Sequence, residues 1–141
     1  MIRLLLAALT ALALAAGTSV ALAQSGPDRQ DQQHFRDMAQ ANMAEVQAGK
    51  LAQQRATSDS VKEFAEHMVK DHSRMMEEQR AMAKAKGLQM PGQVKQEHRD
   101  AMKKLQAAKG PQFDSAYMAQ MVKDHERSLE LARTAARSAQ D

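Results

Sequence analysis

Apolar side chains recur every third or fourth residue along four stretches of this chain, and short segments rich in glycine, proline or serine separate those stretches. This spacing puts the apolar side chains on one face of a helix. Aromatic residues make up only 3% of the chain, and abundant alanine, glutamine, lysine, methionine and arginine favour helix over strand. The sequence therefore predicts an all-α fold with helices over residues 31–56, 60–86, 93–108 and 111–139.

Short joints between these helices decide how they pack. Ser60 and Glu63 match a capping box that would open the second helix, Gly87 would close it, and Pro111 suits the first position of the fourth. Because each joint has only a few residues, neighbouring helices are expected to run antiparallel. The prediction is one domain, an antiparallel four-helix bundle over residues 31–139.

The first 23 residues have the three parts of a secretory signal peptide. Arg3 gives a positive start, residues 4–16 are apolar or small except for Thr10, and residues 21–23 read Ala-Leu-Ala, a small-residue cleavage pattern. The apolar run is shorter than the ~20 residues that a bilayer span needs. We expect cleavage after Ala23, a flexible segment over residues 24–30, and a periplasmic or secreted protein with no stable membrane span.

The distribution of charge bears on which partners the mature chain can bind, and the cysteine content bears on how its fold is stabilised. The 20 basic and 17 acidic residues are mixed along the sequence, whereas a nucleic-acid-binding surface needs basic residues gathered on one face. We therefore expect no nucleic-acid partner. The chain has no cysteine, so helix packing must hold it together without disulfides.

A five-residue sequence occurs twice. Residues 68–72 and residues 121–125 both read Met-Val-Lys-Asp-His, one on the second predicted helix and one on the fourth. This repeat predicts two related helical hairpins in a pseudo-twofold arrangement, with the two histidines in equivalent places.

Polar side chains from all four helices are expected to meet in the interior. At 100° per residue, His72, His98 and His125 lie on the buried stripes of the last three helices, and Asn42 lies on that of the first, with Glu45 at its flank. A rise of ~1.5 Å per residue places them at roughly one height in an antiparallel bundle.

Three imidazoles with a carboxylate suit a divalent transition metal such as zinc, copper or iron. The candidate metal ligands are Glu45, His72, His98 and His125. Asp71 and Asp124 lie at the edges of their stripes, where each could accept the second ring N–H of a histidine on a neighbouring helix.

Two other interpretations stay open. The layer could be a hydrogen-bonded network that sets helix register in a structural or protein-interaction bundle, which the amide of Asn42 favours. Methionines beside His72 and His125 would suit copper, in a copper- or iron-handling redox protein. A carboxylate-bridged di-iron centre is not expected, because Val69 and Val122 stand where its Glu-x-x-His motifs need glutamate. No nucleophile or phosphate-binding loop is present either, so we favour a function without catalysis.

Several of these residues resemble the motifs of a bacterial exported family called domain of unknown function 4142. The resemblance covers residues 31–139 and rests on the Asp-His pairs and on the element Phe113-Asp114-x-x-Tyr117. It implies a ferritin-like four-helix fold and export, but no established activity. The matching residues, carried over as site candidates, are Glu45, Asp71, His72, Asp114, Tyr117, Asp124 and His125. One difference from ferritins is that residues 87–92 can span only about 20 Å, which favours a simple up-down-up-down path.

Overall fold

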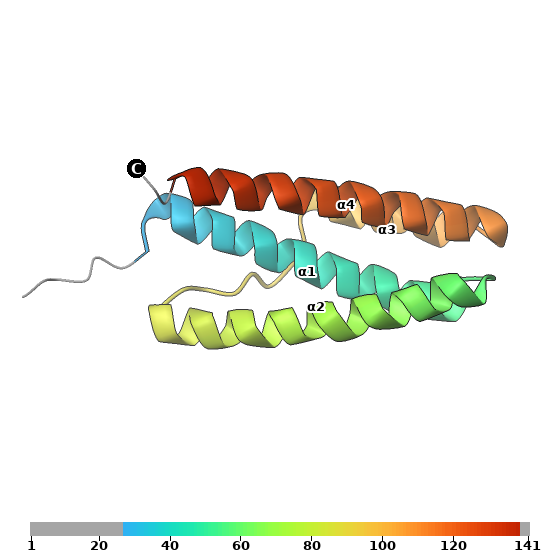
Figure 1. Ribbon diagram of the computed structural model, residues 1–141, viewed down its shortest axis with the longest axis horizontal. Helices are drawn as coiled ribbons and strands as arrows, with labels where there is room; N and C mark the ends of the chain where they lie inside the picture. Colours follow the sequence, from blue (N-terminus) through green and yellow to red (C-terminus); the bar gives the residue numbers. More distant parts are fainter. Residues whose placement is uncertain (1–26, 139–141) are drawn as a thin grey trace, which may run out of the picture.

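Four α-helices make up the fold in the computed structural model, which describes residues 27–138 (Figure 1). They are α1 (Arg29–Arg55), α2 (Asp59–Lys86), α3 (Gln96–Ala107) and α4 (Pro111–Ser138), and no strand occurs among the described residues. The predicted all-α four-helix bundle is confirmed. The signal peptide predicted over residues 1–23 lies outside the described residues.

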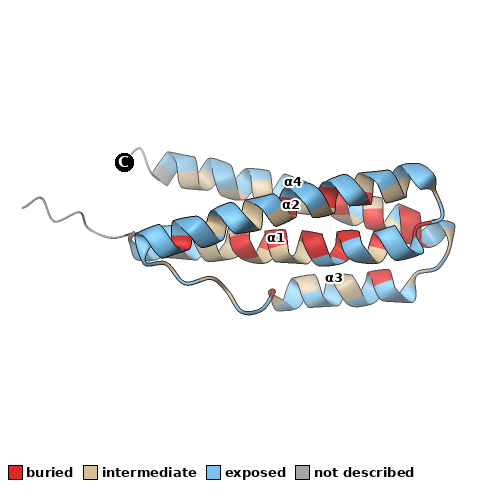
Figure 2. Cartoon of the chain, turned by 90° about the horizontal axis from the view of Figure 1, so that it is seen from below, coloured by how far each residue is buried: buried red, intermediate tan, exposed pale blue. Residues whose placement is uncertain are grey.

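The central helix of the bundle is α1, which packs on α2, on α4 and on α3. Successive helices run in alternating directions, as expected for an up-down-up-down path (Figure 1). The connection between α2 and α3 runs back along α1, so α3 starts partway along the bundle (Figure 2). With 12 residues against 28 in α4, α3 covers only the N-terminal part of α4.

The apolar core is concentrated near the α1–α2 and α3–α4 turns. Phe113 and Tyr117 are fully buried and stacked, with ring centroids 6.3 Å apart, and Phe64 of α2 meets Tyr117 edge-on at 6.1 Å. Small residues let α1 approach α2 closely, since a Cβ on Gly49 would lie 2.8 Å from Val69 Cγ2. The remaining buried members are Ala48, Ala52, Ala56, Ala65, Met68, Leu105 and Met121.

The helix ends agree only in part with the sequence prediction. Gly87 closes α2 in the left-handed region, with φ 67°, and Pro111 opens α4, both as expected. The predicted capping box is wrong, because α2 already begins at Asp59 and Ser60 lies inside its first turn. The third helix begins at Gln96 rather than at residue 93, because Lys95 before it is extended.

A carboxylate from another helix takes the place of the capping box. Asp114 of α4 accepts hydrogen bonds from the backbone N–H groups of Thr57 and Ser58, at 3.0 and 2.8 Å, and from the Thr57 hydroxyl, at 2.7 Å. These bonds hold the pKa of Asp114 below its usual value, the Thr57 hydroxyl being the main cause. Asp114 therefore ties the α1–α2 turn to the start of α4.

Candidate metal centre

Three helices bring one carboxylate and two imidazoles together midway along the bundle. Glu45 comes from α1, His72 from α2 and His125 from α4, and one ligand atom from each lies within 4.8 Å of the others. It is the only such group of three or more His, Cys, Asp or Glu side chains in residues 27–138. Both imidazoles belong to the repeated five-residue sequence, and their rings meet edge-on with centroids 5.6 Å apart.

His72 is held in one orientation by two oxygen acceptors. Its Nδ1 lies 2.7 Å from Glu45 Oε2 and 2.9 Å from Asn42 Oδ1. The Asn42 amide donates in the other direction, from Nδ2 to Gln79 Oε1 at 3.1 Å, which fixes its oxygen towards His72. Because both neighbours are acceptors, we assign the ring proton to Nδ1. In the neutral ring, Nε2 then keeps its lone pair.

His125 is oriented in the same way by its own helix. Its Nδ1 lies 2.8 Å from the Met121 carbonyl oxygen, one turn earlier, so this nitrogen donates and Nε2 again keeps the lone pair. Its side chain is 49% exposed, against 11% for His72. The predicted central position of His125 is therefore wrong: α4 is rotated so that Met121 takes the buried place and His125 lies at the rim.

Glu45 is buried with one carboxylate oxygen unpartnered within residues 27–138. The residue is only 2% exposed, and its Oε1 has no hydrogen-bond partner within the described residues. His125 Nδ1 lies 3.9 Å from that oxygen, which is too long for a hydrogen bond. An unsatisfied buried polar atom costs about 1–3 kcal/mol, and more when it is charged. The sequence placed Glu45 at the flank of its apolar stripe, but in the structure its side chain is buried.

The other predicted site residues lie elsewhere. His98 does not join the group, because it lines a small crevice with Asp37, Lys95 and Glu97 where α3 meets α1 and α4. There, Lys95 pairs with Asp37 at 2.8 Å and Arg127 pairs with Glu97 at 2.6 Å, so the crevice is lined by ion pairs.

Neither aspartate of the repeat forms a hydrogen bond or an ion pair with an imidazole within residues 27–138. Asp71 is exposed, and Asp124 accepts hydrogen bonds from Gln120 on its own helix at 2.8 and 2.9 Å. Asp114 holds a turn, as described above. Tyr117 is fully buried, and its hydroxyl has no partner within residues 27–138. Burial raises the pKa of Tyr117 above its ordinary value, and the charge of Glu45 adds to this.

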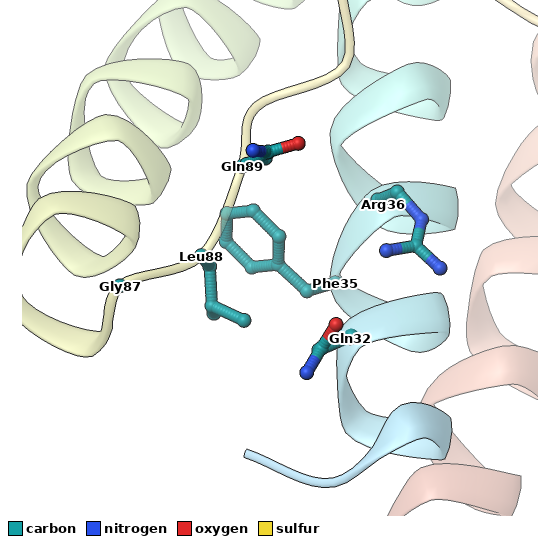
Figure 3. Close-up of a pocket in the computed structure, with 6 residues that line it drawn as sticks. All are labelled: Gln32, Phe35, Arg36, Gly87, Leu88 and Gln89. Carbon is teal, nitrogen blue, oxygen red and sulfur yellow. The ribbon is translucent and has the colours of Figure 1, made fainter. Parts of the chain in front are cut away.

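Two of the hollows on the surface of residues 27–138 differ in what they touch, and one of the two is lined by His125 of the candidate centre. The first, of about 470 Å³, is lined by His125 and by apolar side chains that include Phe64, Met118 and Met121. The second, of about 290 Å³, lies where the start of α1 meets the α2–α3 connection, and Figure 3 shows its six lining residues. Neither was predicted, because each depends on how segments distant in sequence pack.

Comparison with known proteins agrees with the sequence motifs. A family model described as Domain of unknown function (DUF4142) matches residues 16–141. No curated protein and no solved structure matches the chain. Among residues 27–138, none of the helices combines the length and apolar character needed to cross a bilayer.

Proposed function

We propose that this chain, which belongs to the DUF4142 family, binds a divalent transition metal ion through Glu45, His72 and His125. The observation that carries this proposal is the buried carboxylate of Glu45, which lies within 4.8 Å of both imidazoles. Its Oε1 has no hydrogen-bond partner within residues 27–138. A cation bound there would give Oε1 a compensating positive charge. The family description assigns no activity, so the proposal rests on these side chains.

The orientation of the imidazoles supports the same function. In metal sites a ligating histidine usually donates its other ring N–H to a carboxylate or a backbone carbonyl. His125 has this arrangement towards the Met121 carbonyl. His72 Nδ1 faces Glu45 Oε2 itself at 2.7 Å, so this nitrogen would exchange its proton for the metal ion. One nitrogen of each imidazole and a carboxylate oxygen of Glu45 would form the ligand set. Ligands about 2.0–2.2 Å from a zinc ion lie closer together than 4.8 Å, so the half-exposed His125 would move inward on binding.

Two histidines and one carboxylate leave coordination positions free, which is typical of sites that exchange ligands rather than of closed structural sites. Among the metals, the surroundings favour copper. Met118 and Met121 line the hollow that His125 also lines, and thioethers with imidazole suit copper, Cu(I) especially. We therefore place copper ahead of zinc and iron as the ion to test first.

We also propose that the protein acts in the cell envelope after export. The support is the sequence of residues 1–23, with its basic start, apolar run and Ala-Leu-Ala cleavage pattern. N-terminal sequencing of the protein recovered from a periplasmic fraction tests this, with Gln24 expected as the first residue. A chain recovered with residues 1–23 intact would contradict it.

The test of metal binding is elemental analysis of the mature protein, followed by thermal melts with copper, zinc or iron added. We expect near-stoichiometric metal and a melting temperature that rises with metal concentration by mass action. Glu45→Gln and His125→Ala should each remove this rise. The matched control is His67→Ala, because His67 is exposed on α2 and its loss should leave the rise unchanged. A second control, His98→Ala, separates the centre from the crevice.

Absence of metal and of any thermal shift would contradict the proposal. The group would then be a hydrogen-bonded layer that sets helix register, a role for which the Asn42–His72 bond is the specific observation. That role predicts that a combined Glu45→Leu, His72→Leu variant is tolerated, because apolar side chains can replace a buried polar pair with little loss. A metal-binding role predicts that the variant folds but no longer responds to metal.

A further inference from the structure

One face of α4 is apolar and is not covered by any other helix of residues 27–138. Val122 and Leu129 are 58% and 51% exposed, and with Met82 of α2, also 51%, they are the exposed large apolar side chains of residues 27–138. They stand seven residues apart, on one face of the helix. From residue 122 to residue 137 no residue is buried (Figure 2).

These two residues belong to a longer stripe with alternating spacings of four and three residues. Its members are Met118, Val122, His125, Leu129, Ala132 and Ala136. All except Met118 are exposed. A repeat of 3.5 residues is the pattern by which one helix packs along another in a coiled coil. The inner face of α4, which includes Phe113, Tyr117 and Met121, is a separate stripe already buried in the bundle.

The stripe is uncovered because it lies on the side of α4 that faces α2, and α2 packs mainly on α1. α3 packs on another side of α4, where Glu97 pairs with Arg127 at 2.6 Å and His98 lines a crevice with Leu131. The hollow of about 470 Å³ beside the stripe is lined by Val122, His125 and Leu129, with Phe64 of α2 on its other side. The surface therefore offers both a ridge and a groove to a second helix.

The charges beside the stripe indicate which helix fits. Glu126 and Arg133 follow His125 and Ala132 directly, on the solvent side of the stripe, and they are seven residues apart. Glu126 forms no ion pair within residues 27–138, and Arg133 approaches only Glu130, at 4.0 Å. If a second α4 lies antiparallel, with each Leu129 against Ala132 of the other copy, each Glu126 meets Arg133 of the other copy. A parallel pairing would not bring these residues together.

We propose that this α4 stripe is the interface of an antiparallel homodimer. Leu129 of each copy packs on Ala132 of the other, and His125 faces Ala136 of the second copy. Large side chains against alanines let the two helices approach closely, and two symmetric Glu126–Arg133 pairs fix direction and register. The dimer does not depend on the metal proposed above, and it would cover the exposed side of His125.

Sedimentation equilibrium of the metal-free mature protein, over a range of concentrations up to millimolar, tests the dimer. We expect a dimer whose fraction rises with concentration. Leu129→Glu should make the protein monomeric, because it places a charge on the contact. The matched control is Leu131→Glu, two residues away on a different face of α4; circular dichroism would establish that each variant still folds.

Charge reversal tests the direction and the register. Glu126→Arg alone and Arg133→Glu alone should each weaken dimerisation by about tenfold or more, because like charges would then face each other. The double variant Glu126→Arg, Arg133→Glu should restore it. A wild-type protein that stays monomeric at every concentration would overturn the proposal. So would a dimer that survives Leu129→Glu, or one that is indifferent to the single reversals.

Discussion

Tyr117 gives the sharpest test of the packing described above, because it is the only tyrosine in a chain without tryptophan. Its side chain is fully buried and its hydroxyl has no partner within residues 27–138. Burial therefore raises its pKa in the folded protein, and the negative charge of Glu45 raises it further. In the unfolded chain the phenol should titrate near its ordinary value of about 10.

The sign of the pH effect follows from this difference. Since the folded state holds the proton more tightly, the stability due to Tyr117 is complete below about pH 10 and is lost as the pH rises above it. Each pH unit above that point costs about 1.4 kcal/mol of folding free energy, until the folded phenol itself ionises. At about pH 11 the wild-type protein should therefore have lost about 1.4 kcal/mol through this residue.

The perturbation is Tyr117→Phe, which keeps the ring that stacks on Phe113 and meets Phe64. At neutral pH we expect stability to be unchanged or higher by up to about 2 kcal/mol, because the variant no longer buries an unsatisfied hydroxyl. Urea denaturation at about pH 8 and at about pH 11 should show a decline that is about 1.4 kcal/mol smaller in the variant. Other groups that titrate in this range are common to both proteins.

Absorbance of the phenolate gives an independent reading, since only one residue contributes. The folded protein should show almost no phenolate at about pH 11, and the signal should appear on unfolding. Two results would refute the reasoning: a phenol that titrates near pH 10 in the folded protein, or a loss of more than about 1 kcal/mol in Tyr117→Phe at neutral pH. The second would mean that the hydroxyl has a hydrogen-bond partner in solution.

Three further predictions follow from single contacts. Gly49→Val should destabilise the fold by about 2 kcal/mol or more in urea denaturation, because its Cβ would lie 2.8 Å from Val69 Cγ2; Gly92→Ala, with nothing within 4 Å of the new Cβ, should change stability by less than about 0.5 kcal/mol. Asp114→Asn should lower the neutral-pH urea midpoint and flatten its acid dependence. The depressed pKa of Asp114 means that its contribution is present above its unfolded pKa and is lost as the pH falls through its folded pKa; equal acid slopes in both proteins would contradict this. Phe113→Ala should cost about 3–5 kcal/mol in thermal or urea unfolding, since its fully buried ring leaves a cavity; a cost below about 1 kcal/mol would show that the site collapses.

The helices themselves could be predicted from the sequence because their causes are local. Apolar spacing, a left-handed Gly87 and a first-position Pro111 act within a few residues of where they stand. The same local geometry correctly turned Asn42 and His72 inward, since both lie near the centre of their apolar stripes. These predictions need only the helical repeat of 3.6 residues.

Tertiary packing decided the rest, because it sets rotations and registers that a single helix does not specify. A small rotation of α4 buried Met121 and left His125 at the rim, although His125 and His72 occupy identical five-residue sequences. The turn before α2 is held by Asp114, 56 residues away from Ser58, where a local capping box had been expected. Glu45 lies beside His72 of α2 and His125 of α4 because α1 is the central helix and packs on both. Sequence alone thus determined which segments are helical, and contacts between distant segments determined which side chains meet.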